Sequence, residues 1–102
     1  MNYVELESKL KSIPTIETVK PYRSDNFITP WVVGFIPLVK NVSAEISYGE
    51  AFGGGYCIGF TLFENEKLMS YEKREGFDWC FMEDEINNIS EYVNKVKNEI
   101  KL

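Results

Sequence analysis

Residues 42–63 read VSAEISYGEAFGGGYCIGFTLF, two strand-like runs on either side of a glycine-rich stretch. In residues 42–48 Val, Ala, Ile and Tyr alternate with Ser, Glu and Ser. This two-residue period predicts a strand with one packed face and one wet face. Residues 56–63 form a second run, rich in β-branched and aromatic side chains. Because a glycine-rich stretch predicts a reversal, the two runs are expected to pair as antiparallel neighbours.

The chain before this pair predicts one helix and two further strands. Residues 3–13 place apolar side chains on one helical stripe, and a proline follows them. Residues 15–23 contain Pro21, which fits an edge strand or a strand end. Residues 31–39 are apolar at both parities, which predicts a strand that is covered on both faces. Pro37 then requires a bulge or an end to pairing nearby.

The chain after the pair predicts short strands and a long helix. Residues 65–67 predict a turn, residues 68–73 a further strand, and Glu75-Gly76 a second reversal. The last helix carries an apolar stripe with spacings of four and three residues, formed by Met82, Ile86, Ile89, Val93, Val96 and Ile100. Residues 77–82 either return as a last strand or begin this helix, and their aromatic content after a reversal favours the strand.

Together these elements predict an α+β fold for a single domain, residues 1–102. Its centre is an antiparallel, meander-like β-sheet of four to six strands, flanked by an N-terminal and a C-terminal helix. The exposed edge of residues 15–23 leaves open whether the protein is a monomer or a dimer.

Composition argues against several classes of enzyme and metal site. Histidine is absent, which removes the commonest general base and metal ligand. Cys57 and Cys80 are too few for a structural zinc site, and we interpret both as small buried apolar residues. The run Gly53-Gly54-Gly55 lacks the residues that follow in phosphate-binding loops, so a hairpin loop is favoured. We therefore predict a protein that is not an enzyme and that uses no cofactor or metal.

Charge is distributed unevenly along the chain. Sixteen acidic and eleven basic residues give a net charge of −5, which argues against nucleic-acid binding through phosphates. Residues 64–91 hold nine of the acidic and three of the basic residues, so this segment carries −6 and the rest of the chain +1. A solvated surface explains this pattern, and so does a negative patch that attracts a basic protein. The predicted binding residues are Glu64, Glu66, Glu72, Glu75, Asp78, Asp84 and Glu85, together with the aromatic Phe52 and Tyr56 beside the glycine run.

The order of elements supports one resemblance. An acidic α+β chain with an N-terminal helix, a meander, and Asp78-Trp79-Cys80-Phe81 before an acidic helix start resembles the small immunity proteins that bacteria pair with polymorphic toxins. The resemblance implies a toxin domain as partner, held by carboxylates that pair with its lysines and arginines.

Three functions from different classes follow as hypotheses. The first is an immunity protein that neutralises a basic toxin domain. The second is a phage-type inhibitor of a host defence protein, which would use the same electrostatics. The third is a small-ligand-binding domain with a pocket between sheet and helices. The N-terminus has no apolar signal segment and no stretch is long enough to span a bilayer, so a cytoplasmic protein without membrane contact is expected.

Overall fold

The computed structural model describes residues 3–13, 16–23, 31–50 and 56–100. Its helices and strands follow in the order α1 (Tyr3–Lys11), β1 (Glu17–Arg23), β2 (Trp31–Pro37), β3 (Val42–Glu50), β4 (Tyr56–Glu64), β5 (Lys67–Leu68), α2 (Tyr71–Arg74), β6 (Trp79–Met82), η1 (Glu83–Asn88, a 3-10 helix) and α3 (Ile89–Glu99). The predicted α+β class is confirmed.

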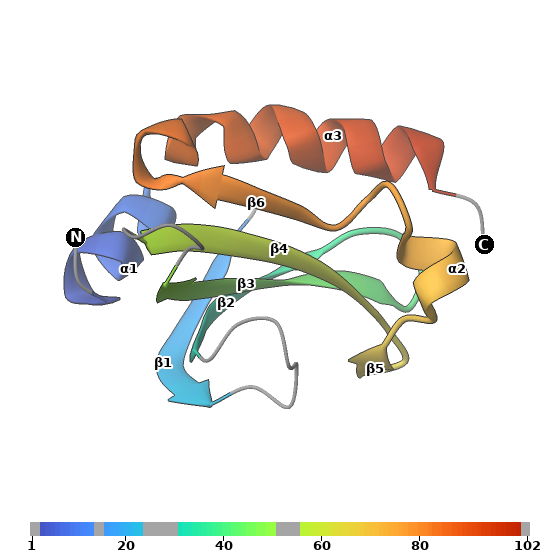
Figure 1. Cartoon of the computed structure of the whole chain (residues 1–102), viewed down its shortest axis with the longest axis horizontal. Helices are drawn as coiled ribbons and strands as arrows, with labels where there is room; N and C mark the ends of the chain where they lie inside the picture. The colour runs from blue at the N-terminus through green and yellow to red at the C-terminus, as the bar shows by residue number, and fades with distance from the viewer. Residues whose placement is uncertain (1–2, 14–15, 24–30, 51–55, 101–102) are drawn as a thin grey trace.

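The strands form one antiparallel sheet, in which β1 to β5 are neighbours in chain order. The strand β6 pairs with β4 as well, on the edge where β5 pairs further along the same strand. Figure 1 shows α3 lying across this sheet, with α1 at one end of the molecule and α2 at the other. Two ends of β4 therefore define two ends of the molecule, one near η1 and one near α2.

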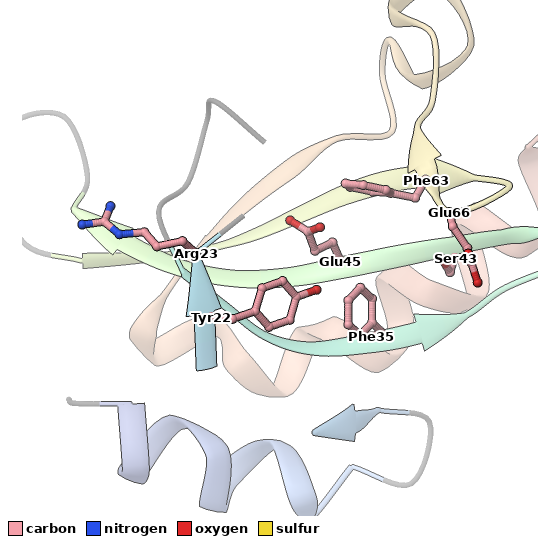
Figure 2. A pocket seen from close by; sticks show the side chains of 7 residues that line it. All are labelled: Tyr22, Arg23, Phe35, Ser43, Glu45, Phe63 and Glu66. Carbon is pink, nitrogen blue, oxygen red and sulfur yellow. The ribbon is translucent and has the colours of Figure 1, made fainter. Parts of the chain in front are cut away.

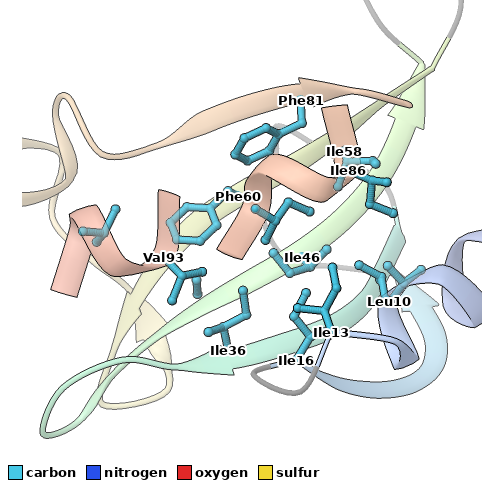
Figure 3. Close-up of a cluster of buried hydrophobic side chains, with 14 of the residues drawn as sticks. Leu10, Ile13, Ile16, Ile36, Ile46, Ile58, Phe60, Phe81, Ile86 and Val93 are labelled. Carbon is cyan, nitrogen blue, oxygen red and sulfur yellow. The ribbon is translucent and has the colours of Figure 1, made fainter. Parts of the chain in front are cut away.

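The face of the sheet beneath α1 and α3, here called the helix face, holds the hydrophobic core (Figure 3). The alternation predicted for residues 42–48 is confirmed on this face, where Val42, Ala44, Ile46 and Tyr48 are buried. Burial of a side chain of the size of valine or isoleucine contributes about 1.5–3 kcal/mol. The stripe of α3 is buried against them at Ile89, Val93 and Val96, which docks the helix on the sheet.

The opposite face of the sheet, here called the far face, is not wet as predicted. Register places Phe35, Glu45 and Thr61 side by side on it, and Val32 beside Ser47. Glu45 is only 3% exposed, and Ser47 and Thr61 are also buried. A period of two shows that the two faces differ in polarity, but it does not show how much solvent each face meets.

Two strand predictions near the N-terminus are confirmed. The strand β1 lies at the sheet edge, and its register with β2 shifts between Thr18 and Tyr22, the interval that contains Pro21. The strand β2 is buried from both sides and ends at Pro37, and its register with β3 also shifts, between Val32 and Gly34. Such irregularities bend a strand and increase its twist.

The strand predicted for residues 68–73 is wrong. The strand β5 ends at Leu68, and the chain then forms the short helix α2, in which the amides of Lys73 and Arg74 both donate to the Ser70 carbonyl at 3.1 Å. The Arg74 guanidinium turns back to the Met69 carbonyl, with Nε donating at 2.7 Å. This contact between residues five apart requires a turn rather than extended backbone.

The segment 77–82 contains a strand, as favoured, and this strand corrects two further expectations. Because β6 continues to Met82, the last helix begins at Glu83, and Met82 is exposed rather than part of the apolar stripe. Cys57 is buried as predicted, whereas Cys80 on β6 is exposed. None of the helices that the structure describes is long and apolar enough to cross a membrane.

Candidate functional site

The structure separates the predicted acidic residues into two groups at opposite ends of β4. Glu64, Glu66, Glu72 and Glu75 lie at the end where β5 and α2 follow (Figure 1). Asp84 and Glu85 lie in η1, directly after Met82, which pairs with Cys57 near the other end of β4. At about 3.3 Å of rise per strand residue, the two ends are roughly 25 Å apart. The predicted acidic residues therefore do not form a single compact patch.

Three of the predicted carboxylates are bound within the protein. Glu64 pairs with Lys73 at 3.1 Å, and the Glu85 carboxylate accepts the backbone N–H of Met82 at 3.0 Å. Asp78 accepts the backbone N–H of Leu62 at 3.2 Å and pairs with Arg74 at 2.5 Å. These contacts give each of the three groups a structural role.

The Asp78 contact completes one edge of the sheet. Along this edge β4 pairs first with β6 and then with β5, and Leu62 lies between the two paired stretches. Its N–H is satisfied by the Asp78 carboxylate, and its carbonyl accepts the N–H of Met69 at 3.1 Å. Asp78 therefore replaces a missing strand partner, and it also neutralises Arg74, which is buried.

The remaining predicted residues differ in their surroundings. Glu72, Glu75 and Asp84 are exposed, and the described part of the chain gives them no hydrogen bond or ion pair. Glu66 stands in the turn between β4 and β5, where Asn65 and Glu66 both have positive φ. Tyr56 is exposed and stacks on Tyr48 at 5.1 Å between ring centroids. Phe52 and the glycine run lie outside the described residues.

A groove at the edge between β6 and α3 was not predicted from the sequence. It has a volume of about 500 Å³, and its aromatic lining consists of Trp79, Phe81 and Tyr92. Trp79 is 55% exposed, whereas Phe81 on the same strand is buried. Glu85 and Glu91 lie on the same groove. We call this the β6–α3 groove.

Tyr92 fixes one wall of the β6–α3 groove. Its ring meets Phe60 and Phe81 edge to face at centroid distances of 5.0 and 5.5 Å, and its hydroxyl donates to the Phe77 carbonyl. Burial, and then the negative charges of Asp78 and Glu99, raise the pKa of Tyr92 to about 12. The phenol of Tyr92 is therefore neutral at ordinary pH, and its ring and hydroxyl are both held by contacts within the protein.

The groove collects negative charge and little positive charge. Two carboxylates, Glu85 and Glu91, line the groove, and Asp84 is exposed next to Glu85 in η1. One basic residue, Lys95, also lines the groove, and its ammonium lies 6.0 Å from the centre of the Tyr92 ring. An exposed tryptophan beside several carboxylates is suited to bind a protein surface that carries lysine or arginine.

The free edge of β6 offers little backbone for strand addition. The Met82 N–H points away from β4, because it donates to Glu85. The direction of backbone groups alternates along a strand. The backbone N–H of Cys80 therefore also points outward, whereas the backbone N–H groups of Trp79 and Phe81 point toward β4. With the Met82 N–H already bound, Cys80 supplies the one unclaimed outward N–H within β6. This edge therefore offers mainly side chains, and little backbone, for contact with another molecule.

Cys80 is a poor nucleophile despite its exposure. Partial burial, followed by the neighbouring Cys57 thiol and the Glu85 carboxylate, raises the pKa of Cys80 to about 12. The reactive thiolate is therefore scarce at neutral pH. Among the described residues, no group of three or more cysteines and carboxylates is arranged to hold a metal ion.

A second hollow lies on the far face (Figure 2). It has a volume of about 470 Å³, and Tyr22, Phe35, Phe63 and Glu45 surround it. Tyr22 and Phe35 stack at 6.3 Å between ring centroids. Figure 2 shows the Glu45 carboxylate between this pair and Phe63.

Another hollow on the far face, of about 500 Å³, adjoins the hollow between Tyr22 and Phe63. Ser43 and Glu66 line both. Asn41 and Asn65 complete its lining, and their side chains are hydrogen bonded to each other. We call the two hollows together the far-face trough. The third hypothesis, a small-ligand-binding domain, placed a pocket between sheet and helices, whereas this trough lies on the far face of the sheet.

Comparison with known proteins finds no matching family model, curated protein or solved structure.

Proposed function

We propose that this chain is a non-catalytic binding protein whose partner is a basic protein domain. Its biological role is that of a cytoplasmic immunity protein, which neutralises a toxin domain by occupying its surface. The observation that carries the proposal is the β6–α3 groove, where the exposed Trp79 lies beside Glu85 and Glu91, and Lys95 is the one basic residue of the lining.

Trp79 is the expected anchor of the interface. Tryptophan is enriched among the residues that contribute most to protein–protein affinity, because it buries a large rigid surface. Its neighbour Tyr92 is held by ring contacts and by the Phe77 carbonyl. The anchor site is thus formed before the partner arrives, which lowers the entropy lost on binding.

The carboxylates supply attraction and selectivity. Glu91 lies on the groove, and Asp84 is exposed in η1 next to Glu85. Charges of one sign around a docking surface accelerate association with an oppositely charged partner, and salt weakens this effect. They also disfavour acidic surfaces, which suits a protein that must recognise one basic domain.

Two double variants with the same change in charge test the proposal. The first, Asp84→Lys with Glu91→Lys, alters the groove, and the second, Glu72→Lys with Glu75→Lys, alters the α2 end. All four side chains are exposed, so both variants are expected to fold. The partner is first isolated with the wild-type chain from its native cell and identified, and its association rate is then measured at low salt.

The groove variant is expected to associate about tenfold or more slowly, and the α2 variant about twofold, because only the first changes charges at the interface. Trp79→Ala is expected to increase the dissociation rate. Equal effects of the two double variants would show that net charge acts without a defined site. A partner without basic character, or one released unchanged by Trp79→Ala, would refute the proposal.

A further inference from the structure

We propose that Cys57, Cys80 and Met82 form a binding site for Cu(I), a soft metal ion. The three sulfur atoms come from two neighbouring strands, β4 and β6. The site lies on the far face of the sheet, whereas the β6–α3 groove lies on the helix face. It therefore goes beyond the proposed function and does not depend on a protein partner.

The register between β4 and β6 places the three side chains on one face of the sheet. Met82 is directly opposite Cys57. Cys80 is directly opposite Gly59, which is two residues from Cys57 along β4. Residues that are directly opposite share a face, and so do residues two apart on one strand. Thr61 on the far face is two residues beyond Gly59, so the sulfur atoms lie on that face.

The backbone pattern brings Cys57 and Met82 close together. The Met82 N–H donates to Glu85 and not to β4, so Cys57 and Met82 form a pair without mutual backbone hydrogen bonds. Side chains approach most closely in such pairs, whose Cα atoms are about 4.5 Å apart. The methionine side chain is unbranched and flexible, so its sulfur can adjust to a metal ion beside Cys57.

The two thiols are neighbours in the same cluster. A hydrogen bond links the side chains of Cys80 and Cys57, and both cysteines are free. They are diagonal neighbours across the two strands, a placement that separates residues by about 7–8 Å. A disulfide usually joins Cα atoms about 4.4–6.8 Å apart. A metal ion between the two sulfur atoms adds a second bond to the bridge and spans the wider gap.

The donor set selects a soft metal ion. Thiolate and thioether sulfur favour Cu(I), whereas Mg²⁺ and Ca²⁺ prefer oxygen. A structural zinc ion takes four ligands, which these three side chains do not supply. Cu(I) is stable with fewer sulfur ligands, in a linear or trigonal arrangement. The third ligand is a thioether, so the site differs from the clusters of cysteines and carboxylates that the described residues lack.

Binding of Cu(I) leaves its oxidation state unchanged. Each thiol that coordinates the ion releases its proton to solvent and becomes a thiolate, because the bound metal strongly favours the deprotonated form. The thioether of Met82 has no proton to lose. Cu(I) with two thiolates therefore has a net charge of −1.

The site combines a fixed inner ligand with two outer ligands that solvent reaches. Cys57 is 7% exposed, and its strand pairs with β3 on one side and with β6 on the other. Cys80 and Met82 are exposed. A metal ion can therefore enter from the side of β6 and meet a cysteine that the sheet holds in place.

Cu(I) is the probe, added without oxygen to the reduced full chain in competition with a chromophoric Cu(I) chelator. One ion per chain is expected to bind, to produce thiolate-to-Cu(I) charge-transfer absorption in the ultraviolet, and to raise the unfolding temperature. Zn²⁺ is the control ion and is expected to show no saturable binding at the same concentrations.

Two methionine variants separate the site from unspecific binding of copper to sulfur. Met82→Leu removes the thioether at the site, and Met69→Leu removes one that is buried beyond the other end of β4. Both replacements keep side-chain volume and polarity nearly constant, so both variants are expected to fold. Loss of a supporting contact around a metal costs about ten- to a hundredfold in affinity, so loss of the Met82 ligand is expected to cost at least tenfold. Met69→Leu is expected to leave the affinity unchanged.

Cys80→Ser removes a thiolate at an exposed position and is expected to weaken binding more than Met82→Leu does. Equal affinities of Met82→Leu and Met69→Leu would refute the three-sulfur site. Undiminished binding by folded Cys80→Ser would refute it as well. Failure of the reduced, folded wild-type chain to compete for Cu(I), or equally tight binding of Zn²⁺, would have the same consequence.

Discussion

At the scale of single residues, Asp78 shows how a carboxylate can look like a binding residue in the sequence and be structural in the fold. It satisfies the Leu62 N–H in a gap of the sheet edge and neutralises a buried arginine. Glu64 is likewise paired with Lys73, and Glu85 accepts the Met82 N–H. The charge count of residues 64–91 was correct, but a count does not reveal which carboxylates already have a partner.

Asp78→Ala is expected to destabilise the protein by about 3 kcal/mol, because it leaves the Arg74 charge buried without a counterion. The control Glu75→Ala removes an exposed carboxylate nearby. Its free energy of unfolding is expected to stay within about 0.5 kcal/mol of the wild-type value. Denaturant unfolding measures both. The double variant Asp78→Ala with Arg74→Met should lose less stability than the two single variants lose in sum, since no unpaired buried charge is left. Equal stability of the two alanine variants would contradict the role given to Asp78.

The thiol of Cys80 gives a prediction for pH dependence. Its pKa is raised from 9.0 to about 12, so the thiolate becomes abundant only as the pH approaches 12. Alkylation by iodoacetamide at pH 8 is expected to be about thirty- to a hundredfold slower than for an unperturbed thiol, because the loss of thiolate outweighs the greater nucleophilicity of a more basic sulfur. The rate should rise about tenfold for each pH unit between 8 and 11. Intact-mass measurements on native and unfolded protein test this, and a native rate equal to the unfolded rate would contradict it.

At the scale of elements, the local sequence pattern predicted the helices and strands that carry a repeating apolar pattern. It missed the features that depend on contacts with other parts of the chain. The alternation in β3 and the stripe of α3 concern many residues, so their periods identified both elements and their buried sides. The short helix α2 spans only four residues, too few to show a helical period, and the Arg74 contact to the Met69 carbonyl that accompanies it has no signal in the local pattern. The β6–α3 groove was missed for a similar reason, because the exposure of Trp79 depends on its place at a sheet edge.

Gly34 on β2 packs closely against β1 and the residue before it, Ile16. A Cβ atom at this position would lie 3.1 Å from the Glu17 carbonyl oxygen and 3.2 Å from Cγ2 of Ile16. Gly34→Ala is therefore expected to destabilise the protein by about 1–3 kcal/mol, because the Glu17 backbone cannot move without disturbing its pairing with Phe35. Thermal unfolding measures the loss. Gly76→Ala provides a contrast, since no atom lies within 4 Å of its Cβ position and only the positive φ of 85° opposes it.

At the scale of the whole molecule, both outer edges of the sheet discourage pairing with another copy. The edge strand β1 contains Pro21, which has no N–H, and an irregular register. On the other side Glu85 occupies the Met82 N–H of β6. These two features interrupt the row of backbone N–H donors at each edge of the sheet. Dimerisation by strand pairing is therefore disfavoured.

The protein is expected to be a monomer, and Glu85 is expected to contribute to that state. Sedimentation velocity should give the mass of one chain, about 11.8 kDa. Glu85→Ala frees an edge donor and removes a negative charge beside exposed Trp79 and Met82, so weak self-association is expected at high concentration. Asp84→Ala removes the same charge without freeing a donor and should remain monomeric. A wild-type dimer at low concentration would contradict the blocked edges, and equal association of the two variants would assign the effect to charge alone.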